Sequence, residues 1–363
     1  MITISLCMIV KNEEAVLGRV LQQMKGIADE IIIVDTGSTD RTREIAEQFT
    51  ELVFDFPWIQ DFSAARNFAC SKASKDYWMW LDADDVVRPD QQKLLLKLKK
   101  TLKKDTDVVM AKYLTGFDKD GNVTFSYYRE RLIKNGKGFF WSGKVHEAVT
   151  PRGNIVYSDL EIEHRKEKEG DSDRNLKIYQ SMLANDEKLE PRHQFYYGRE
   201  LYYHKHYDEA VRVFEAFLEE PEGWVENQID ACLQLSYCFG KLNKKKDAIK
   251  ALLGSFLYDA PRAEVCCEIG KLFLEGDSLN QAVYWYKQAL LLKPEVKSGG
   301  FVLEDCYGYI PYVQLCVCYD RLGNREKAFE YHKLAMALKP EAEAVKLNQA
   351  YFERLLEKQK IKE

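Results

Sequence analysis

The stretch Tyr77-Trp-Met-Trp-Leu-Asp82-Ala83-Asp84-Asp85 joins an apolar run to three carboxylates. The apolar part has the length and composition of a buried strand. In open α/β sheets, ligands bind beyond the carboxyl ends of the strands, so acids at that point are candidate ligand contacts. Two acids separated by one residue can face the same cation, and Mg²⁺ or Mn²⁺ favours oxygen ligands. We therefore expect a strand here and a divalent metal site on Asp82 and Asp84.

An acidic helix cap is the alternative interpretation of this triplet. Asp is favoured at the first turn of a helix, and Pro89 with Asp90 marks a helix start just downstream. The position of the triplet behind a Trp-rich strand favours the metal site.

The first half of the chain alternates short apolar runs with helical patterns, which is typical of a mainly parallel sheet with covering helices. Asn12 and Glu13 follow the first apolar run, and Asp35 follows the second. The expected strands are residues 2–10, 30–34, 52–56, 77–81 and 108–113, and the expected helices are residues 15–24, 41–49 and 62–73.

A second constellation is Ile31-Ile-Ile-Val34-Asp35-Thr-Gly37-Ser-Thr-Asp40. Asp35 ends a buried strand and could accept hydrogen bonds from a base or ribose. Gly37 supplies a turn, and one of the three residues after it caps the next helix, which is compatible with ligand binding. For Asn12 and Glu13, a helix N-terminal turn is the alternative to a binding role.

Beyond residue 164 the sequence carries a repeat instead of strands. Four copies pair a small residue with an alanine twelve positions later, at spacings of 38, 34 and 46 residues. A 34-residue period is typical of tetratricopeptide repeats, and the longer steps indicate insertions, the largest at residues 296–309. A repeat-free helical bundle is the alternative. The pairs are Gly198 with Ala210, Ser236 with Ala248, Gly270 with Ala282, and Cys316 with Ala328.

Together, four motifs in the first 165 residues resemble the family 2 glycosyltransferases of the GT-A fold. They are Ser5-Leu-Cys-Met-Ile-Val-Lys-Asn12-Glu13-Glu14, Ile33-Val-Asp35-Thr-Gly-Ser-Thr-Asp40, Ala64-Ala-Arg66-Asn67 with Ala69 beyond, and Leu81-Asp82-Ala-Asp84-Asp85. The resemblance implies a UDP-sugar donor, a divalent cation (Mn²⁺ or Mg²⁺) and an inverting displacement. Glu13 and Asp35 would lie near the uracil and ribose, Asp82 on the donor sugar or ribose, and Asp84 on the metal. The implied donor-binding set is Val10, Asn12, Glu13, Asp35, Arg66, Asp82, Ala83 and Asp84. An exposed surface cation is the alternative role for Arg66.

The segments Phe139-Phe-Trp141-Ser-Gly143-Lys-Val-His146-Glu147 and Glu161-Ile-Glu-His164 are similar to repeat-bearing members of the family, including the sublancin-type peptide S-glycosyltransferases. This similarity suggests His164 as a further metal ligand, with His146 as the competing candidate. Mn²⁺ tolerates imidazole beside carboxylate. A structural histidine is the alternative for each.

An inverting transfer needs a base that takes the proton of the acceptor. Glu147 is our first choice and Asp85 the second. An ion pair with Lys144 or Arg129 is the alternative role for Glu147. Trp141 either walls a sugar pocket or belongs to the core.

The composition sets wider bounds on function. The 363 residues exceed one usual core, and 46% hydrophobic with 31% charged residues indicates a folded protein. A net charge of −5 argues against nucleic-acid binding. Nine cysteines without Cys-x-x-Cys spacing indicate reduced core residues. The start lacks the features of a secretory signal and no run is long enough to span a membrane, so we expect a cytoplasmic location.

The expected organisation is an α/β GT-A domain (Rossmann-like, residues 1–165), a connector (166–190), an all-α tetratricopeptide-repeat superhelix (191–345) and a charged helix or tail (346–363). The expected activity is transfer of a hexose or N-acetylhexosamine to a protein or peptide side chain presented by the repeats, which could also form a homodimer. A nucleotidyltransferase and an inactive binding scaffold are the alternatives. The first strand lacks the glycine-rich loop that usually follows it in nucleotidyltransferases, and the intact acids argue against an inactive scaffold.

Overall fold

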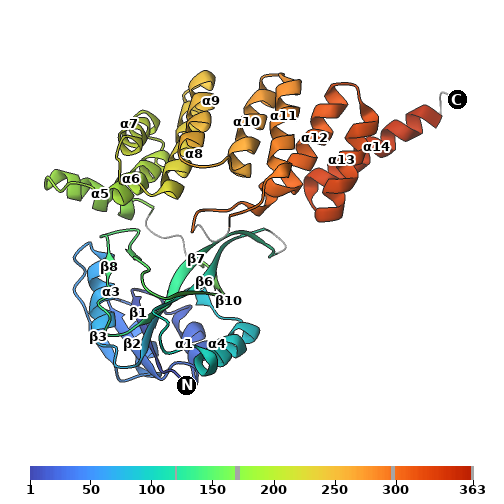
Figure 1. Ribbon diagram of the computed structural model, residues 1–363. Helices are drawn as coiled ribbons and strands as arrows, with labels where there is room; N and C mark the ends of the chain where they lie inside the picture. Colours follow the sequence, from blue (N-terminus) through green and yellow to red (C-terminus); the bar gives the residue numbers. More distant parts are fainter. Residues whose placement is uncertain (119–120, 168–171, 296–298, 361–363) are drawn as a thin grey trace. The chain divides into compact units, whose positions relative to one another are not determined.

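The computed structural model describes residues 1–118, 121–167, 172–295 and 299–360 (Figure 1). The chain forms two compact units, Met1–Tyr196 and Tyr197–Glu363. The expected insertion at residues 296–309 begins with residues 296–298, which lie outside the described part.

The first unit is built on an eight-stranded sheet whose order is β3-β2-β1-β4-β7-β6-β10-β5. Its parallel part confirms the expected strands: β1 (Ile4–Val10) lies between β2 (Glu30–Asp35) and β4 (Tyr77–Trp80), and β3 (Val53–Asp55) pairs with β2. In this register Val10 lies opposite Asp35 and Cys7 opposite Trp80. The residues that follow β1, β2 and β4 therefore leave the sheet at the same edge.

The other half of the sheet is mixed. β7 (Val123–Lys134) is antiparallel to both β4 and β6 (Val108–Phe117), whereas β10 (Ile155–His164) runs parallel to β6. The short β5 (Asp85–Val86) pairs antiparallel with β10, with His164 opposite Asp85. A separate hairpin joins β8 (Trp141–Ser142) and β9 (Ala148–Val149). Of these strands, the sequence analysis predicted β6 alone.

Helices cover both faces of the sheet. Side chains alternate along β1, so Leu6 and Met8 pack with Leu17 and Leu21 of α1 on one face, whereas Cys7 packs in the aromatic cluster on the other. α4 contributes to the first cluster and α3 to the second. The helices of this part are α1 (Leu17–Met24), α2 (Thr42–Glu47), α3 (Phe62–Ser71), α4 (Pro89–Thr101) and α5 (Arg174–Ala184).

The second unit is a series of antiparallel helix pairs, and this confirms the repeat architecture (Figure 1). Two short 3₁₀ segments, η1 (Ser255–Leu257) and η2 (Glu304–Tyr307), interrupt the series. The pairs are α6 (Pro191–Tyr203) with α7 (Tyr207–Leu218), α8 (Val225–Lys241) with α9 (Lys245–Gly254), α10 (Ala263–Glu275) with α11 (Leu279–Leu291), and α12 (Tyr309–Arg321) with α13 (Arg325–Leu338), followed by α14 (Glu343–Lys360).

Small residues set the close approach within these pairs. A Cβ added at Gly198 would lie 2.7 Å from the ring of Phe214, and one added at Gly270 would lie 3.0 Å from the ring of Tyr286. The paired alanines Ala210, Ala248, Ala282 and Ala328 are all fully buried. The predicted offsets therefore mark contact positions between the two helices in the Gly198 and Gly270 repeats.

The nine cysteines are all free thiols, and eight of them are buried, as expected of reduced core residues. Within the described ranges, none of the helices has both the length and the apolar character needed to cross a membrane.

Candidate active site

The turn after β4 brings two carboxylates and an imidazole together. Asp82 lies two residues after the end of β4, and the pairing of β5 with β10 places His164 beside Asp85. One ligand atom from each of Asp82, Asp85 and His164 lies within 4.8 Å of the others. Among the residues that the structure describes, this is the one group of three or more such side chains with that geometry. The donor set matches the oxygen and imidazole ligands that Mn²⁺ accepts.

Asp85 forms the buried floor of this group. Its side chain is fully buried, and Oδ2 accepts hydrogen bonds from the backbone N–H of Asp82 (3.0 Å) and from Nη1 of Arg131 (3.3 Å). The Tyr113 hydroxyl donates to Oδ1 at 2.7 Å. Both oxygens are therefore occupied by protein donors, and this environment does not favour the role of base that was our second choice for Asp85.

His164 closes the group from the strand β10. Its Nδ1 lies 3.2 Å from Oδ1 of Asp85 and 3.3 Å from Oδ1 of Asp84. Burial by itself lowers the pKa of His164, but the hydrogen bonds to Asp84 and Asp85 outweigh burial and raise that pKa to about 10. The carboxylates thus attract positive charge to this position, which is the electrostatic requirement for a cation site.

Arg66 connects this group to a third carboxylate. Its Nη2 lies 2.8 Å from Oδ1 of Asp82, and its Nε lies 2.6 Å from Oε1 of Glu147. The guanidinium is 4.8 Å from the centre of the Trp141 ring and 5.1 Å from that of Trp80. Arg66 is 8% exposed, so the alternative of a surface cation is wrong.

Charge pairing sets the protonation of Asp82. Burial raises its pKa, but the Arg66 guanidinium outweighs this effect and holds the pKa of Asp82 well below its usual range. Asp82 is therefore ionised at neutral pH.

Glu147 pairs with Arg66 and not with the cations considered from the sequence. Lys144 contacts Glu187 at 2.7 Å, and Arg129 contacts Glu130 at 2.9 Å. The alternative of an ion pair between Glu147 and either of those two cations is corrected accordingly. The Glu147 side chain remains 12% exposed, so an acceptor could approach it.

The side chain of Asp35 stabilises the turn that follows β2. Oδ1 of Asp35 accepts hydrogen bonds from the backbone N–H groups of Gly37 (2.8 Å) and Ser38 (2.7 Å), and Gly37 has a φ of +99°. Thr36 donates to the carbonyl of Val10 through its N–H at 2.9 Å. These bonds hold the ends of β1 and β2 side by side at the edge of the sheet.

Hydrogen bonds connect the turn after β1 to the segment that follows β2. Asn12 has a φ of +55°, and its Oδ1 accepts the backbone N–H of Thr39 at 2.7 Å. The Glu13 N–H donates to Oγ1 of Thr42 at 2.6 Å. The turn role considered for Asn12 and Glu13 is thus present, and it fixes both residues at the predicted nucleotide edge. Ala83, between Asp82 and Asp84, is buried.

His146 lies outside the carboxylate group. Its ring stacks on that of Tyr196, with centroids 4.2 Å apart and planes 11° apart. Its carbonyl accepts hydrogen bonds from Arg192 at 3.3 Å. This packing is the structural role that the sequence left open, and His164 is the histidine that joins the acids.

Two residues that the sequence analysis missed complete the site. Arg131 is fully buried, and its guanidinium lies 3.6 Å from the centre of the Trp80 ring and 4.2 Å from that of Tyr113. The Tyr113 hydroxyl lies 2.9 Å from Nδ1 of His164. The available sequence signal was a run of charged residues inside the apolar strand at residues 123–134. Trp141, at 2% exposure, belongs to the core beside Trp80.

Comparison with known proteins identifies the class to which this domain belongs. Residues 5–152 match the family model "Glycosyl transferase family 2", so the first unit contains a family 2 glycosyltransferase domain.

Three curated relatives are similar to parts of the chain. A TPR repeat-containing protein of Synechococcus elongatus is 36% identical over 41% of this chain and 36% of its own length. The lipopolysaccharide core biosynthesis glycosyltransferase LpsC of Rhizobium meliloti is 30% identical over 40% of this chain and 56% of its own. The SPbeta prophage-derived glycosyltransferase SunS of Bacillus subtilis is 28% identical over 58% of this chain and 51% of its own. The matches thus span between about a third and a little over half of these relatives.

Proposed function

We propose that the protein is a metal-dependent, inverting glycosyltransferase that moves a hexose or N-acetylhexosamine from a UDP-sugar to a protein or peptide side chain. The observation that carries the proposal is the connected set of Asp82, Asp85 and His164 at the sheet edge, bridged by Arg66 to Glu147. The family 2 domain match and the two relatives named as glycosyltransferases support it.

The metal ligands in this proposal are Asp82, Asp84 and His164, with Asp85 orienting the imidazole. The side chains of all three reach the surface, at 29% exposure for Asp82, 22% for Asp84 and 28% for His164. Bound Mn²⁺ or Mg²⁺ would neutralise the charge that develops on the departing diphosphate. His146 is not part of this set, because its ring packs on Tyr196.

The donor nucleotide would lie along the locked turns after β1 and β2. Asp35 offers a carboxylate at that edge for the ribose or base, and Val10, Asn12 and Glu13 shape the adjoining wall. Preformed turns of this kind reduce the ordering that the nucleotide must cause when it binds.

Glu147 is the proposed base. An inverting displacement needs a carboxylate on the acceptor side to take the proton of the attacking oxygen or sulfur. The ion pair with Arg66 holds the Glu147 carboxylate in place. The same cation pairs with Asp82, so the base is held at a fixed place relative to the acids.

The repeat unit motivates the polypeptide acceptor. Stacked helix pairs offer an extended surface that suits an unfolded segment of chain. Self-association of two copies through the repeats is the other use of this surface.

One assay tests the proposal. The full chain is incubated with a panel of UDP-sugars with and without Mn²⁺, and UDP release is measured for the wild type, for Asp84→Asn and for Asp105→Asn, an exposed acid away from the site. We expect metal-dependent release that Asp84→Asn abolishes and Asp105→Asn preserves. Pyrophosphate release from a nucleoside triphosphate and a sugar phosphate would instead show a nucleotidyltransferase, and silence with every donor would show a binding scaffold.

A further inference from the structure

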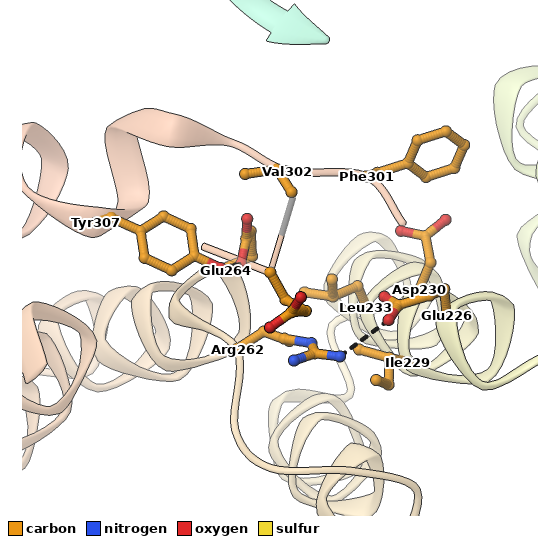
Figure 2. A pocket seen from close by; sticks show the side chains of 10 residues that line it. Glu226, Ile229, Asp230, Leu233, Arg262, Glu264, Phe301, Val302 and Tyr307 are labelled. Atoms are coloured by element: carbon orange, nitrogen blue, oxygen red, sulfur yellow. Dashed lines mark hydrogen bonds and ion pairs between the residues drawn. The ribbon is translucent and has the colours of Figure 1, made fainter. Parts of the chain in front are cut away.

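The second unit contains a pocket between α8, α10 and the segment that leads into η2 (Figure 2). The pocket is partly open, and the space between its walls is about 400 Å³ including solvent-accessible volume. Its lining combines acids with apolar side chains: Glu226, Ile229, Asp230, Leu233, Arg262, Glu264, Glu295, Phe301, Val302 and Tyr307. The proposed reaction uses none of these residues.

Two of the four acids in this pocket serve the fold. Glu226 pairs with Arg262 at 2.9 Å, as the dashed line in Figure 2 marks. Glu264 accepts the backbone N–H of Leu303 at 2.8 Å and the hydroxyl of Tyr307 at 2.9 Å, which ties the η2 segment to α10. Both acids are therefore engaged in contacts within the protein.

Asp230 is the acid whose bonding is incomplete. Its Oδ2 is buried and has no hydrogen-bond partner among the described residues. Nη1 of Arg199 forms an ion pair with this oxygen at 3.8 Å, which is beyond hydrogen-bond distance. A buried carboxylate oxygen without a donor is costly, so a ligand that donates to it gains more than it would at the surface.

The chemistry of the lining restricts what could bind there. A divalent cation is not favoured, because the part of the chain that the structure describes places no three ligating side chains of this pocket within reach of one ion. Ile229, Leu233 and Phe301 instead offer an apolar wall next to the Asp230 carboxylate. A long side chain with an apolar stem and a cationic head matches both features.

We propose that this pocket binds an arginine or lysine side chain of a polypeptide partner. The cationic head donates to Asp230, and the aliphatic stem packs on Ile229 and Leu233. The inference rests on the proposed function in one respect, which is that the partner would be the glycosyl acceptor.

The test is direct binding to the full chain, without donor or metal. Nα-acetyl-arginine amide and Nα-acetyl-lysine amide are titrated by calorimetry or saturation-transfer NMR. Nα-acetyl-citrulline amide and Nα-acetyl-norleucine amide are the neutral counterparts of similar shape. We expect at least one cationic amide to bind about tenfold or more tightly than its neutral counterpart, since a charge-assisted hydrogen bond is lost in the latter.

Variants localise the binding. Asp230→Asn should reduce the preference for the cationic amide to near zero, whereas Glu268→Gln, a surface change on α10 outside the pocket, should leave it intact. Equal binding of citrulline and arginine amides, binding of neither cationic amide, or an unchanged preference in Asp230→Asn would overturn the proposal. If Asp230→Asn does not fold by thermal unfolding, the wild-type comparison with the neutral amides decides.

Measurement of UDP release distinguishes a failure of this inference from a failure of the proposed function. Asp230→Asn should leave metal-dependent UDP release by hydrolysis of the donor unchanged. Loss of cation binding with normal UDP release would support the pocket, whereas absent UDP release in a wild type that binds the cationic amide would refute the proposed enzyme alone.

Discussion

The Nε atom of Arg66 lies 2.6 Å from Oε1 of Glu147, and both side chains are mostly buried, at 10% and 12% exposure. The same guanidinium reaches Asp82 through Nη2. The proposed base and a proposed metal ligand therefore share one cation. Asp82 and Glu147 can lie near one another because this cation lies between their carboxylates.

Replacing Arg66 tests that shared role. In Arg66→Lys the ammonium is a single point charge and cannot reproduce the two-sided fork, so one carboxylate loses its partner. We expect the free energy of unfolding to fall by about 1–3 kcal/mol and UDP release to fall with it. Arg43→Lys, at an exposed pair with Glu47, should change the free energy of unfolding by less than about 0.5 kcal/mol. Urea unfolding and the UDP assay make the comparison, and an Arg66→Lys protein as stable and active as wild type would contradict the shared role.

Glu147→Gln removes the proposed base but keeps a side chain of the same shape. We expect kcat for transfer to fall by about 10²- to 10⁴-fold, with little change in the KM for the donor, because the loss concerns proton transfer. Glu187→Gln, which removes the exposed partner of Lys144, is the matched control and should retain kcat. A variant with lower donor affinity but normal kcat would assign Glu147 to donor binding instead.

Glu30, the first residue of β2, is expected to affect how the stability of the protein depends on acidic pH. Burial alone would raise the pKa of Glu30, but hydrogen bonds from Ser5 (2.5 Å) and Ser74 (2.7 and 2.9 Å) outweigh it and lower that pKa. A lowered pKa in the folded state gives stability that is present above the unfolded value and is lost as the pH falls through the folded value. The unfolding free energy of wild type should therefore decline from about pH 5 to about pH 3 more steeply than that of Glu30→Gln.

Chemical denaturation at several pH values measures this difference. Glu44→Gln, at a largely exposed pair with Arg41, serves as the control and should keep the wild-type slope. Parallel curves for wild type and Glu30→Gln would show that the three hydrogen bonds add nothing to acid stability.

The sequence predicted the parallel strands because their signals are local. β1, β2 and β4 are short apolar runs that end at polar residues, and these are the features that a buried parallel strand requires. β7 and β10 were missed because charged residues interrupt them. In the fold those charges find partners from other elements: Arg131 pairs with Asp85, and Glu163 pairs with Arg88.

The candidate site likewise combines residues that are close in the sequence with residues that only the fold brings together. Asp82, Asp84 and Asp85 lie together in the sequence, so their proximity could be predicted without a fold. Arg131 comes from a distant strand, and the sheet register alone brings it to Asp85. The His146 ring stacks on Tyr196, which belongs to α6, about fifty residues further along the chain. No local pattern in the sequence indicated this contact.

Two glycines in the repeat helices, Gly198 and Gly240, give a prediction in which one substitution is the control for the other. In Gly198→Ala the new Cβ would lie 2.7–2.9 Å from ring atoms of Phe214, so α6 and α7 must separate at a cost of about 1–3 kcal/mol. Gly240, near the end of α8, has no atom within 4 Å of the added Cβ, so Gly240→Ala should stabilise its helix by about 0.5–1 kcal/mol. Since the chain has two units, hydrogen exchange followed by mass spectrometry is the appropriate measurement, because it reports opening helix by helix. Faster exchange in α6 and α7 for the first variant, and slower exchange in α8 for the second, are the expected results. Equal effects of the two substitutions would mean that the glycine does not set the spacing of the helices.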